Sequence, residues 1–489
     1  MQNSIQVRWH HAPFPSEMKT KWHTWTRNDL KQISHDFSGS WQKHLHACFQ
    51  VVRSALNMSL PRSVGWTTSP DLPAEARLLI RDAARMYKRG VAFHDPCSEE
   101  TATETLSGQY QIRQTEENSD ELTEILTRKM ADKAYFTLAD QNILRHHVRL
   151  NQITHMPLEA KESLKTPETL IRIVECWDKF HQDKETALII GGGIISDIGA
   201  FAASILGKSF ILVPSTLLAM VDACIGGKCG INIPPFGKNQ AGYFAFPDEV
   251  LLAPSLLRTL PEREFRSGSA ECLKHAFLNP EASDITTLAG ELRQLNPETL
   301  AHRLPELIRF KADLVSRDPL DRGERAILNF GHTLGHALEA ISHSRVEDQH
   351  SIRHGEAVAV GMLFALILSR QTQQLPDHCY NALIQNIYES RILPHPEEVK
   401  QYLGMAPDDP HLPDIAWSYM IHDKKSDHNK EDSSRWILLS GPGRIARDQD
   451  AWTIPVSYQD FLKAWQTFIH IYLELFLTSS SSKIFSWKT

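Results

Sequence analysis

One carboxylate and three histidines in the second half of the chain have the types and spacing of a metal site: Glu271, His332, His336 and His354. One carboxylate and two neutral imidazoles leave coordination positions open for a substrate, as a catalytic zinc ion requires. His332 and His336 would share one face of a helix, so spacing alone favours them as the metal pair. Any one of these histidines is more often a satisfied group at a helix interface. The four together favour a site.

Lysines on glycine-rich loops form a second group. Lys228 follows Ile225-Gly-Gly, Lys238 stands between Gly237 and Asn239, and Lys274 lies three residues after Glu271. Lysines that only confer solubility usually sit among other charges. Cations beside glycines and apolar strands fit the binding of phosphate or carboxylate better.

Arg325 lies one helical turn before Asn329, and Lys311 lies on a preceding helical segment. Arginine presents a planar fork that matches a carboxylate. On spacing alone, a surface salt bridge with Asp318, Asp321 or Glu324 is an equally good interpretation.

A short apolar segment, Thr186 to Ile190, runs into Gly191-Gly192-Gly193, with Asp197 beyond. Glycines at such a turn allow the backbone to approach a pyrophosphate. The spacing does not match the Rossmann fingerprint, so a tight strand-to-helix turn without a ligand is the better interpretation of this feature alone. Asp197 could bind a ribose or favour the first turn of the helix.

The elements that must position these groups change in type near residue 255. Before it, alternating strand and helix patterns indicate an α/β domain; after it, the pattern is almost entirely helical. The expected strands are 134–138, 186–190 and 210–213, with a helix over 166–180, and the expected later helices are 298–317, 326–342 and 355–373. In chain order, the candidate groups predict one pocket for a dinucleotide, a divalent metal and an anionic, polyhydroxylated substrate. A late apolar element over 436–440 has no assigned role.

Composition limits the classes of partner. The chain has 489 residues and a net charge of -7, which argues against nucleic acid or an anionic membrane as the main partner. Its seven scattered cysteines fit reduced thiols in a cytoplasmic protein. The polar N-terminus shows no secretory signal, and the apolar stretch Val358 to Leu368 is about half the length that spans a bilayer, so it predicts a buried helix.

Four segments are therefore expected. Residues 1–120 would be an N-terminal extension of unknown role, in which 98–121 is a polar linker or mobile loop and 74–87 has helical patterning. Residues 121–255 would be the α/β nucleotide-binding domain, 256–478 a mainly helical metal and substrate domain, and 479–489 a disordered tail.

Six motifs in this order make the chain resemble the 3-dehydroquinate synthase family of sugar phosphate cyclases. They are GGGIISDIGAFAAS, PSTLLAMVDACIGGKCGIN, FGKNQAGYF, TLPEREFRSGSAECLK, RAILNFGHTLGHALE and HGEAVAVGM, and the resemblance covers roughly 125–430. It implies an α/β nucleotide-binding domain followed by an all-helical metal domain, a homodimer, and a small sugar phosphate as substrate.

The resemblance also implies a role for each motif residue. It implies that zinc or cobalt is held by Glu271, His332 and His354, which makes His336 a contact of the substrate phosphate. The residues implied for NAD are Gly191, Gly192, Gly193, Asp197, Ser215, Thr216, Lys238, Thr259 and Leu260. Those implied for catalysis are Lys228, Lys274, Lys311, Arg325, Asn329 and His336, with Asp222, Asn239 and one of Lys424 or Lys425 as further substrate contacts.

The reaction implied by the resemblance makes physical sense with these groups. NAD oxidises one ring alcohol, phosphate leaves by elimination, the hydride returns, and an intramolecular aldol reaction closes a carbocycle. Arg325, Lys311 and Asn329 favour a substrate with a carboxylate, hence a heptulosonate 7-phosphate over the substrates of 2-epi-5-epi-valiolone or 2-deoxy-scyllo-inosose synthases. A metal-dependent alcohol dehydrogenase and an inactive scaffold homologue are the alternatives; the lysines argue against the first, and the intact metal ligands against the second.

Four departures from the family pattern stand out. The phosphate-binding Arg-Gly is replaced by Leu206-Gly207-Lys208, so only Lys208 could substitute for the arginine. The usual Gly-Gly-Lys-Thr ends in Cys229, and one extra residue lies between Lys228 and Lys238. The nucleotide-side Glu-x-x-Lys reads Glu159-Ala-Lys161-Glu162, which indicates that its lysine is lost or shifted.

Overall fold

The computed structural model describes residues 4–11, 106–115, 119–132, 134–180, 186–233, 237–282, 284–372, 374–421 and 433–477. The chain divides into two compact units, which we describe separately. The first comprises residues 1–214 and 226–253, and the second comprises 215–225 and 254–489. The expected helix over 74–87, the expected tail and Lys424 and Lys425 lie outside the described residues.

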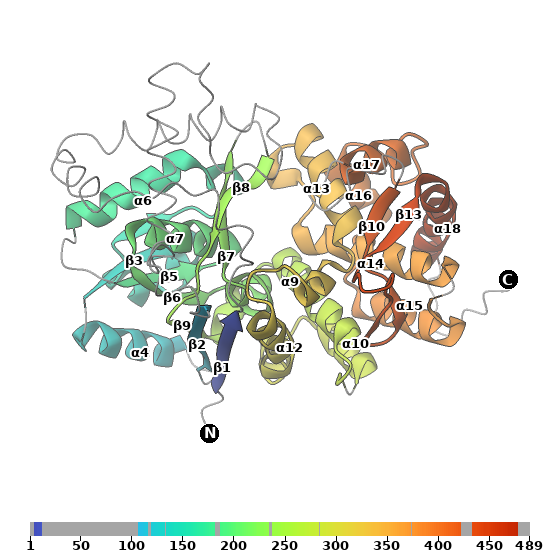
Figure 1. Ribbon diagram of the computed structural model, residues 1–489. Coiled ribbons are helices and arrows are strands. Elements are labelled where there is room, and N and C mark those ends of the chain that lie inside the picture. The colour runs from blue at the N-terminus through green and yellow to red at the C-terminus, as the bar shows by residue number, and fades with distance from the viewer. Residues whose placement is uncertain are drawn as a thin grey trace, which may run out of the picture. The chain divides into compact units, whose positions relative to one another are not determined.

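The first unit is built on a seven-stranded sheet in the order β1-β2-β9-β6-β5-β3-β4 (Figure 1). Six strands run parallel, and β1 pairs antiparallel with β2 at one edge. The strands are β1 (Ser4–His11), β2 (Leu106–Gln114), β3 (Tyr135–Asp140), β4 (Met156–Leu158), β5 (Thr186–Gly191), β6 (Ser209–Pro214) and β9 (Glu249–Leu252).

Helices and a hairpin complete this unit. The helices are α4 (Ser119–Asp132), α5 (Gln141–His146), α6 (Pro167–Phe180) and α7 (Gly193–Leu206), and the hairpin pairs β7 (Lys228–Ile233) with β8 (Gly237–Phe244). Every residue of β3 and β5 is buried, which explains their mostly apolar sequence. The predicted strands over 134–138, 186–190 and 210–213 and the helix over 166–180 are confirmed.

The structure differs from the prediction at the N-terminal boundary. Residues 106–114 were expected in a linker or mobile loop, but they form β2, which pairs with β9. Tyr110 and Ile112 are buried while Gln111 is exposed, which is the period-two pattern of a strand. The strand is short and its exposed face is polar, so its sequence resembles the polar segment around it. Two strands of the sheet therefore come from the segment expected to be a separate extension.

The second unit is mainly helical (Figure 1). Its helices are α8 (Leu217–Val221), α9 (Glu262–Leu278), α10 (Ile285–Arg293), α11 (Pro297–Ala301), α12 (Leu304–Arg317), α13 (His332–Arg345), α14 (His354–Gln371), α15 (Asp377–Ser390), α16 (Pro396–Leu403), α17 (Leu412–Ile421) and α18 (Tyr458–Leu477). Short strands occur near its end: β10 (Ser433–Trp436), β11 (Leu439–Gly441), β12 (Arg444–Ile445) and β13 (Ile454–Ser457).

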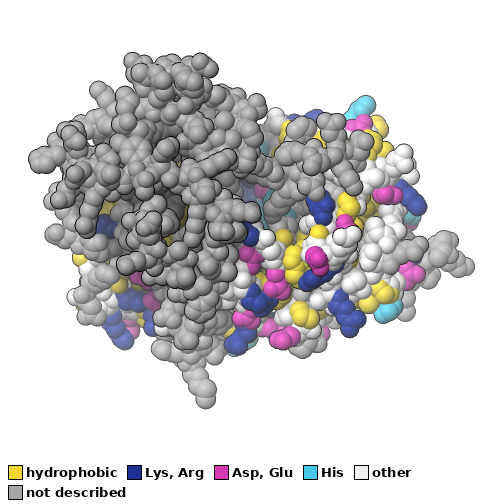
Figure 2. All heavy atoms as spheres, viewed as in Figure 1, with side chains coloured by type: hydrophobic (Ala, Val, Ile, Leu, Met, Phe, Trp, Pro, Cys, Tyr) yellow, Lys and Arg dark blue, Asp and Glu magenta, His cyan; other side chains and the backbone are white. Residues whose placement is uncertain are grey.

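The core of the second unit surrounds α14. All residues of α14 from Gly355 to Ser369 are buried, as the apolar run predicted. Phe364 contacts the rings of Trp436, Phe461 and Phe468, so the late apolar element packs on this helix. Among the described residues, no helix is long and apolar enough to cross a membrane. On the face shown in Figure 2, acidic and basic side chains are interspersed over the described surface.

Candidate active site

The first cluster of the second unit joins three helices. Glu271 lies on α9, and His332 and His354 are the first residues of α13 and α14. The Glu271 Oε1 atom lies 3.8 Å from His332 Nε2 and 3.7 Å from His354 Nε2. The candidate ligand atoms of these three residues all lie within 4.8 Å of one another, which is the spacing of groups around a shared ion.

Glycines allow the helices of the cluster to approach this closely. Gly331 precedes His332 with φ of +79°, in the left-handed region that favours glycine. A Cβ on Gly361 of α14 would lie 1.9 Å from the carbonyl oxygen of Gly331. Gly331 and Gly361 are therefore required for the close packing of α13 against α14.

The hydrogen bonds of the two imidazoles select the ring nitrogens that face Glu271. His332 Nδ1 donates to the carbonyl oxygen of Phe330 at 3.2 Å, and His354 Nδ1 donates to Glu339 Oε2 at 3.1 Å. Burial, followed by the charge of Lys274, holds the pKa of His332 well below its usual value, which keeps the ring neutral. With Nδ1 as the donor, the neutral form of each ring carries its lone pair on Nε2, the nitrogen that faces Glu271, as metal ligation requires.

Glu271 supplies the strongest test of whether these residues fit a cation. It is fully buried, and neither carboxylate oxygen accepts a hydrogen bond among the described residues, although Oε2 lies 2.5 Å from Lys274 Nζ. A buried carboxylate needs compensation by positive charge. A divalent cation at Oε1 and the two Nε2 atoms would provide it.

His336 lies beside this cluster. Its ring centroid is 5.2 Å from that of His332 and 6.3 Å from that of His354, and its side chain is exposed. It belongs to neither of the two metal-compatible groups found among the described residues. The pairing of His332 with His336 that helical spacing favoured therefore has no geometric support.

A second cluster of the same unit concentrates buried charge. Lys311 Nζ on α12 lies 2.5 Å from Asp222 Oδ1 and also donates to the Asp222 carbonyl at 2.6 Å. Burial would raise the pKa of the Asp222 carboxyl, but Lys311 and then Lys274 hold that pKa well below its usual value. Burial lowers the pKa of Lys311, and Asp222 offsets this only in part. The cluster therefore places the ammonium groups of Lys311 and Lys274 near one carboxylate in a buried setting.

Arg325 and Asn329 lie on a 3₁₀ segment, Glu324–Asn329. Arg325 is buried, and its Nη1 donates to the Pro319 carbonyl at 3.0 Å. Of its suggested surface partners, Glu324 instead pairs with Arg317, and Asp318 accepts from the backbone N–H of Arg325. The Arg325 side chain is therefore buried rather than at the surface. Asn329 is half-buried, and its Nδ2 donates to the Ala326 carbonyl.

In the first unit, the triple glycine forms the turn from β5 to α7. Gly191 ends the strand, Gly193 starts the helix, and a Cβ on Gly191 would lie 2.7 Å from Ile195 Cβ. No side chain caps the N-terminus of α7. Its first N–H groups are therefore suited to an anion such as a pyrophosphate.

Asp197 of α7 pairs with Lys165, a contact that the sequence interpretation missed. Lys165 is buried, and its Nζ also donates to Asn239 Oδ1 at 2.6 Å. Glu162, three residues before it, accepts from Asn232 Nδ2 at 2.7 Å. The Glu-x-x-Lys spacing is thus present at Glu162 and Lys165. This spacing was visible in the sequence.

The remaining predicted residues divide between the units. In the first unit, Lys228 is the first residue of β7 and is exposed. Lys238 is the second residue of β8 and is half-buried. Four residues predicted to bind the cofactor belong to the second unit: Ser215, Thr216, Thr259 and Leu260. Thr216 caps α8 by accepting from the Ala219 N–H, and Ser215 Oγ is buried without a hydrogen-bond partner among the described residues.

Two of the sequence departures have a structural account. Gly207 ends α7 in the left-handed conformation, with φ of +65°, and Lys208 follows it half-buried. Cys229 is buried, and burial raises the pKa of its thiol to about 12. The thiol is therefore protonated and packs as a small apolar group.

Comparison with known proteins identifies the family. Models of the N-terminal and C-terminal domains of 3-dehydroquinate synthase match residues 155–267 and 268–426. The 3-dehydroquinate synthase of Leptospira interrogans is 35% identical over 311 residues, covering 63% of this chain and 78% of that protein. The chain belongs to the 3-dehydroquinate synthase family.

Other relatives of the family agree over shorter segments. The 3-dehydroquinate synthase of Synechococcus is 42% identical over 217 residues, covering 43% of this chain. The chain spans only 57%, 66% and 59% of the length of three such relatives. Among solved structures, 2-deoxy-scyllo-inosose synthase with carbaglucose-6-phosphate, NAD+ and Co2+ has a TM-score of 0.61 at 23% identity, covering 74% of this chain and 97% of that one. This likeness shows a shared fold.

Proposed function

We propose that this chain is an NAD- and metal-dependent cyclase of the 3-dehydroquinate synthase type. Its substrate would be a heptulosonate 7-phosphate, which it would convert to a carbocycle with loss of phosphate. The observation that carries the proposal is the pair of buried clusters in the second unit, which share the helix α9: the Glu271, His332 and His354 set and the Lys274, Lys311 and Asp222 set.

The metal would be held by Glu271 Oε1 and by Nε2 of His332 and His354. When bound, the ion would supply a positive charge to polarise an oxygen of the substrate. Glu339 would keep the His354 ring in the tautomer that leaves Nε2 available. Zinc or cobalt suits this donor set of one carboxylate and two imidazoles.

The charged residues of the second cluster would bind and orient the substrate anion. The planar guanidinium of Arg325 suits a carboxylate, and the ammonium groups of Lys311 and Lys274 would neutralise negative charge in a buried setting. Asp222 would hold Lys311 in place. The exposed His336 and the half-buried Asn329 would provide further polar contacts, with His336 at the phosphate.

The first unit would hold the dinucleotide. The uncapped N-terminus of α7 would take the pyrophosphate, and the Asp197–Lys165–Asn239 set would orient hydroxyl groups nearby. When bound, NAD would accept a hydride and return it, so that no net oxidation occurs. Lys228 and Lys238 would add positive charge on this side, and we expect the protein to act as a homodimer.

Turnover of 3-deoxy-arabino-heptulosonate 7-phosphate with NAD and zinc tests the proposal. We expect equal amounts of inorganic phosphate and carbocyclic product, with no accumulation of NADH. Sedoheptulose 7-phosphate, which lacks the carboxylate, should react far more slowly. Accumulating NADH without phosphate release would instead support an alcohol dehydrogenase.

Metal removal provides an independent test. A chelator should abolish turnover, and added zinc or cobalt should restore it, because Lys274 lies at Oε2 and leaves Glu271 Oε1 and the two Nε2 atoms to the ion. Undiminished turnover in a rigorously metal-free sample would refute the metal role.

A further inference from the structure

Two residues of the family motifs have no part in the proposed chemistry: Arg263 of TLPEREF and Glu356 of HGEAV. Glu356 lies in the first turn of α14, two residues after His354, and Arg263 lies in the first turn of α9. We propose that the Arg263–Glu356 ion pair is a positioning device, which holds His354 at the distance from Glu271 that a shared cation requires. The inference rests on the proposed function, since it assumes the cation site.

The pair has the geometry of a strong charge-assisted contact. Arg263 Nε and Nη2 donate to the two Glu356 oxygens, each at 2.7 Å, so the contact is bidentate. Only 4% of the Glu356 side chain is exposed, against 29% for Arg263. Arg263 Nη2 also donates to the Ser351 carbonyl at 2.8 Å, and the guanidinium lies 3.9 Å from the ring centroid of Tyr402. A guanidinium held by this many partners has little freedom to move.

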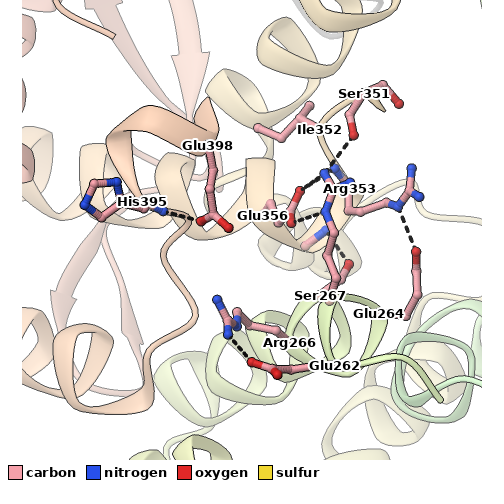
Figure 3. Close-up of polar contacts among 12 residues, drawn as sticks. Glu262, Glu264, Arg266, Ser267, Ser351, Ile352, Arg353, Glu356, His395 and Glu398 are labelled. Carbon is pink, nitrogen blue, oxygen red and sulfur yellow. Dashed lines mark hydrogen bonds and ion pairs between the residues drawn. The ribbon is translucent and has the colours of Figure 1, made fainter. Parts of the chain in front are cut away.

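Glu356 extends the contact to the start of α14. Its Oε2 accepts from the backbone N–H of Arg353, the residue before His354, at 2.8 Å, which closes a capping box (Figure 3). The same carboxylate therefore fixes Arg263 on α9 and the backbone at which His354 begins its helix. A bidentate pair sets direction as well as distance.

One face of α9 carries the whole arrangement. Arg263, Ser267 and Glu271 are spaced four residues apart, so they lie on successive turns of one helix face. Ser267 Oγ accepts from the Gly355 N–H at 3.0 Å, and a Cβ on Gly355 would lie 1.8 Å from the Ser267 carbonyl oxygen. The first turn of α14 thus contacts α9 at Arg263 and Ser267, immediately before the turn that bears Glu271.

A neighbouring ion pair provides a matched control. Arg353 Nε donates to Glu264 Oε1 at 2.7 Å and joins the same two helices, but its side chains are 31% and 38% exposed (Figure 3). Exposed pairs contribute little because water screens them. A second control is Glu398, which completes the capping box of α16 with His395 and contacts none of the candidate ligands in the contacts described (Figure 3).

The test is titration of the metal-free protein with Co2+, read by its visible absorption, with folding checked by circular dichroism. For Arg263→Gln, we expect a loss of Co2+ affinity of roughly 10- to 100-fold, the usual effect of removing a partner that orients a metal ligand. The Co2+ absorption should also change, because His354 is displaced. Glu264→Gln and Glu398→Gln should bind Co2+ within about threefold of the wild-type protein, because neither carboxylate hydrogen-bonds to Arg263 or to a candidate ligand in the contacts described.

Arg263→Lys protects the test against failure to fold. Its ammonium keeps the charge but cannot form the two parallel bonds, so its Co2+ affinity should fall by about fivefold or more. A folded Arg263→Gln protein with wild-type affinity and spectrum would overturn the inference. If Arg263→Gln does not fold, a Co2+ affinity of Arg263→Lys equal to that of the wild-type protein would overturn the inference. If the wild-type protein itself binds no Co2+, the cation site fails, and the positioning role fails with it.

Discussion

At the scale of single residues, oppositely charged side chains in the second unit lie so close together that each influences the pKa of its neighbours. Lys311 and Lys274 keep Asp222 ionised, and Glu271 lies between Lys274 and the imidazoles of His332 and His354. Removing one member leaves another buried charge without compensation, which costs more than the pair itself contributes. The site should therefore respond to single substitutions far more than the exposed surface does.

The first prediction concerns Arg325. Replacing the buried Arg325 with alanine should raise the activation free energy for a carboxylate-bearing substrate by about 2–5 kcal/mol. The reason is that the substrate carboxylate would be left without an opposite charge. kcat/KM for the heptulosonate would fall accordingly, and turnover of sedoheptulose 7-phosphate would change little. Near-normal heptulosonate turnover would contradict the carboxylate assignment.

The second prediction concerns His275, which is fully buried on α9. Burial, and then the charge of Lys274, lowers the pKa of His275 to about 3. The unfolded chain binds a proton below about pH 6.5 and the folded chain does not, so stability is full above that pH and is lost as pH falls toward 3. The loss from this residue is on the order of 4 kcal/mol across that window.

Urea unfolding of the metal-free protein between pH 7.5 and 4.5 measures this effect. His275→Leu removes the titrating ring, so its free energy of unfolding should fall less steeply with acid than that of the wild-type protein. Equal slopes in the two proteins would show that His275 does not carry the effect. His332, whose pKa is also lowered by burial, contributes to the slope that remains.

At the scale of elements, glycines decide how closely the helices that carry the ligands approach. Gly331 and Gly361 let α13 contact α14, and Gly355 lets α14 contact α9. At each of the three, an added Cβ would meet backbone atoms closer than 3.0 Å, and backbone cannot move aside as a side-chain tip can. The ligand geometry thus depends on positions that bind nothing.

The third prediction follows for Gly355→Ala. The new methyl group would lie 1.8 Å from the Ser267 carbonyl oxygen and must separate the two helices. The free energy of unfolding should fall by about 3 kcal/mol, at the upper end for overpacking, and Co2+ affinity should fall with it. Gly290→Ala on α10 is the control, because nothing lies within 4 Å of its Cβ position. It should be neutral or stabilise the protein by up to about 1 kcal/mol. Urea unfolding of both variants checks the prediction, and equal effects would contradict it.

At the scale of the whole molecule, the sheet depends on residues far from the motifs. β2 pairs with β9, and Glu249 of β9 lies 2.6 Å from both Arg113 of β2 and Lys129 of α4. Glu249 is buried, so it needs both cations. The segment outside the family resemblance is therefore part of the α/β fold.

The fourth prediction tests this dependence by truncation. A chain that begins at Ser119 lacks β2, exposes the edge of β9 and leaves Glu249 without Arg113, so it should aggregate or fail to fold. A chain that begins at Thr101 keeps β2 and should retain more soluble protein. Circular dichroism and size-exclusion chromatography compare the two; equally good folding of both would contradict the role of β2.

The sequence allowed much of this architecture to be predicted, for specific reasons. The strands β3, β5 and β6 are mostly apolar and almost entirely buried, and α14 is a long apolar helix that begins with a His-Gly pair, so their patterns were strong. The convergence of Glu271 with His332 and His354 could be proposed only from the family resemblance, because helical spacing favoured His336. Lys165 was missed although its spacing from Glu162 is visible in the sequence. Glu339 and the strand β2 were missed because their contacts, with His354 and β9, join segments that are separate in the sequence.

Glu271 offers its two oxygens to different neighbours, one to the imidazoles and one to the ammonium of Lys274. Occupancy on one side must alter the charge available on the other. By thermodynamic linkage this effect is mutual. If a bound cation changes the affinity for an anion at Lys274 by some factor, the bound anion changes the affinity for the cation by the same factor. The protein should fill the two sites cooperatively, with a single carboxylate as the link.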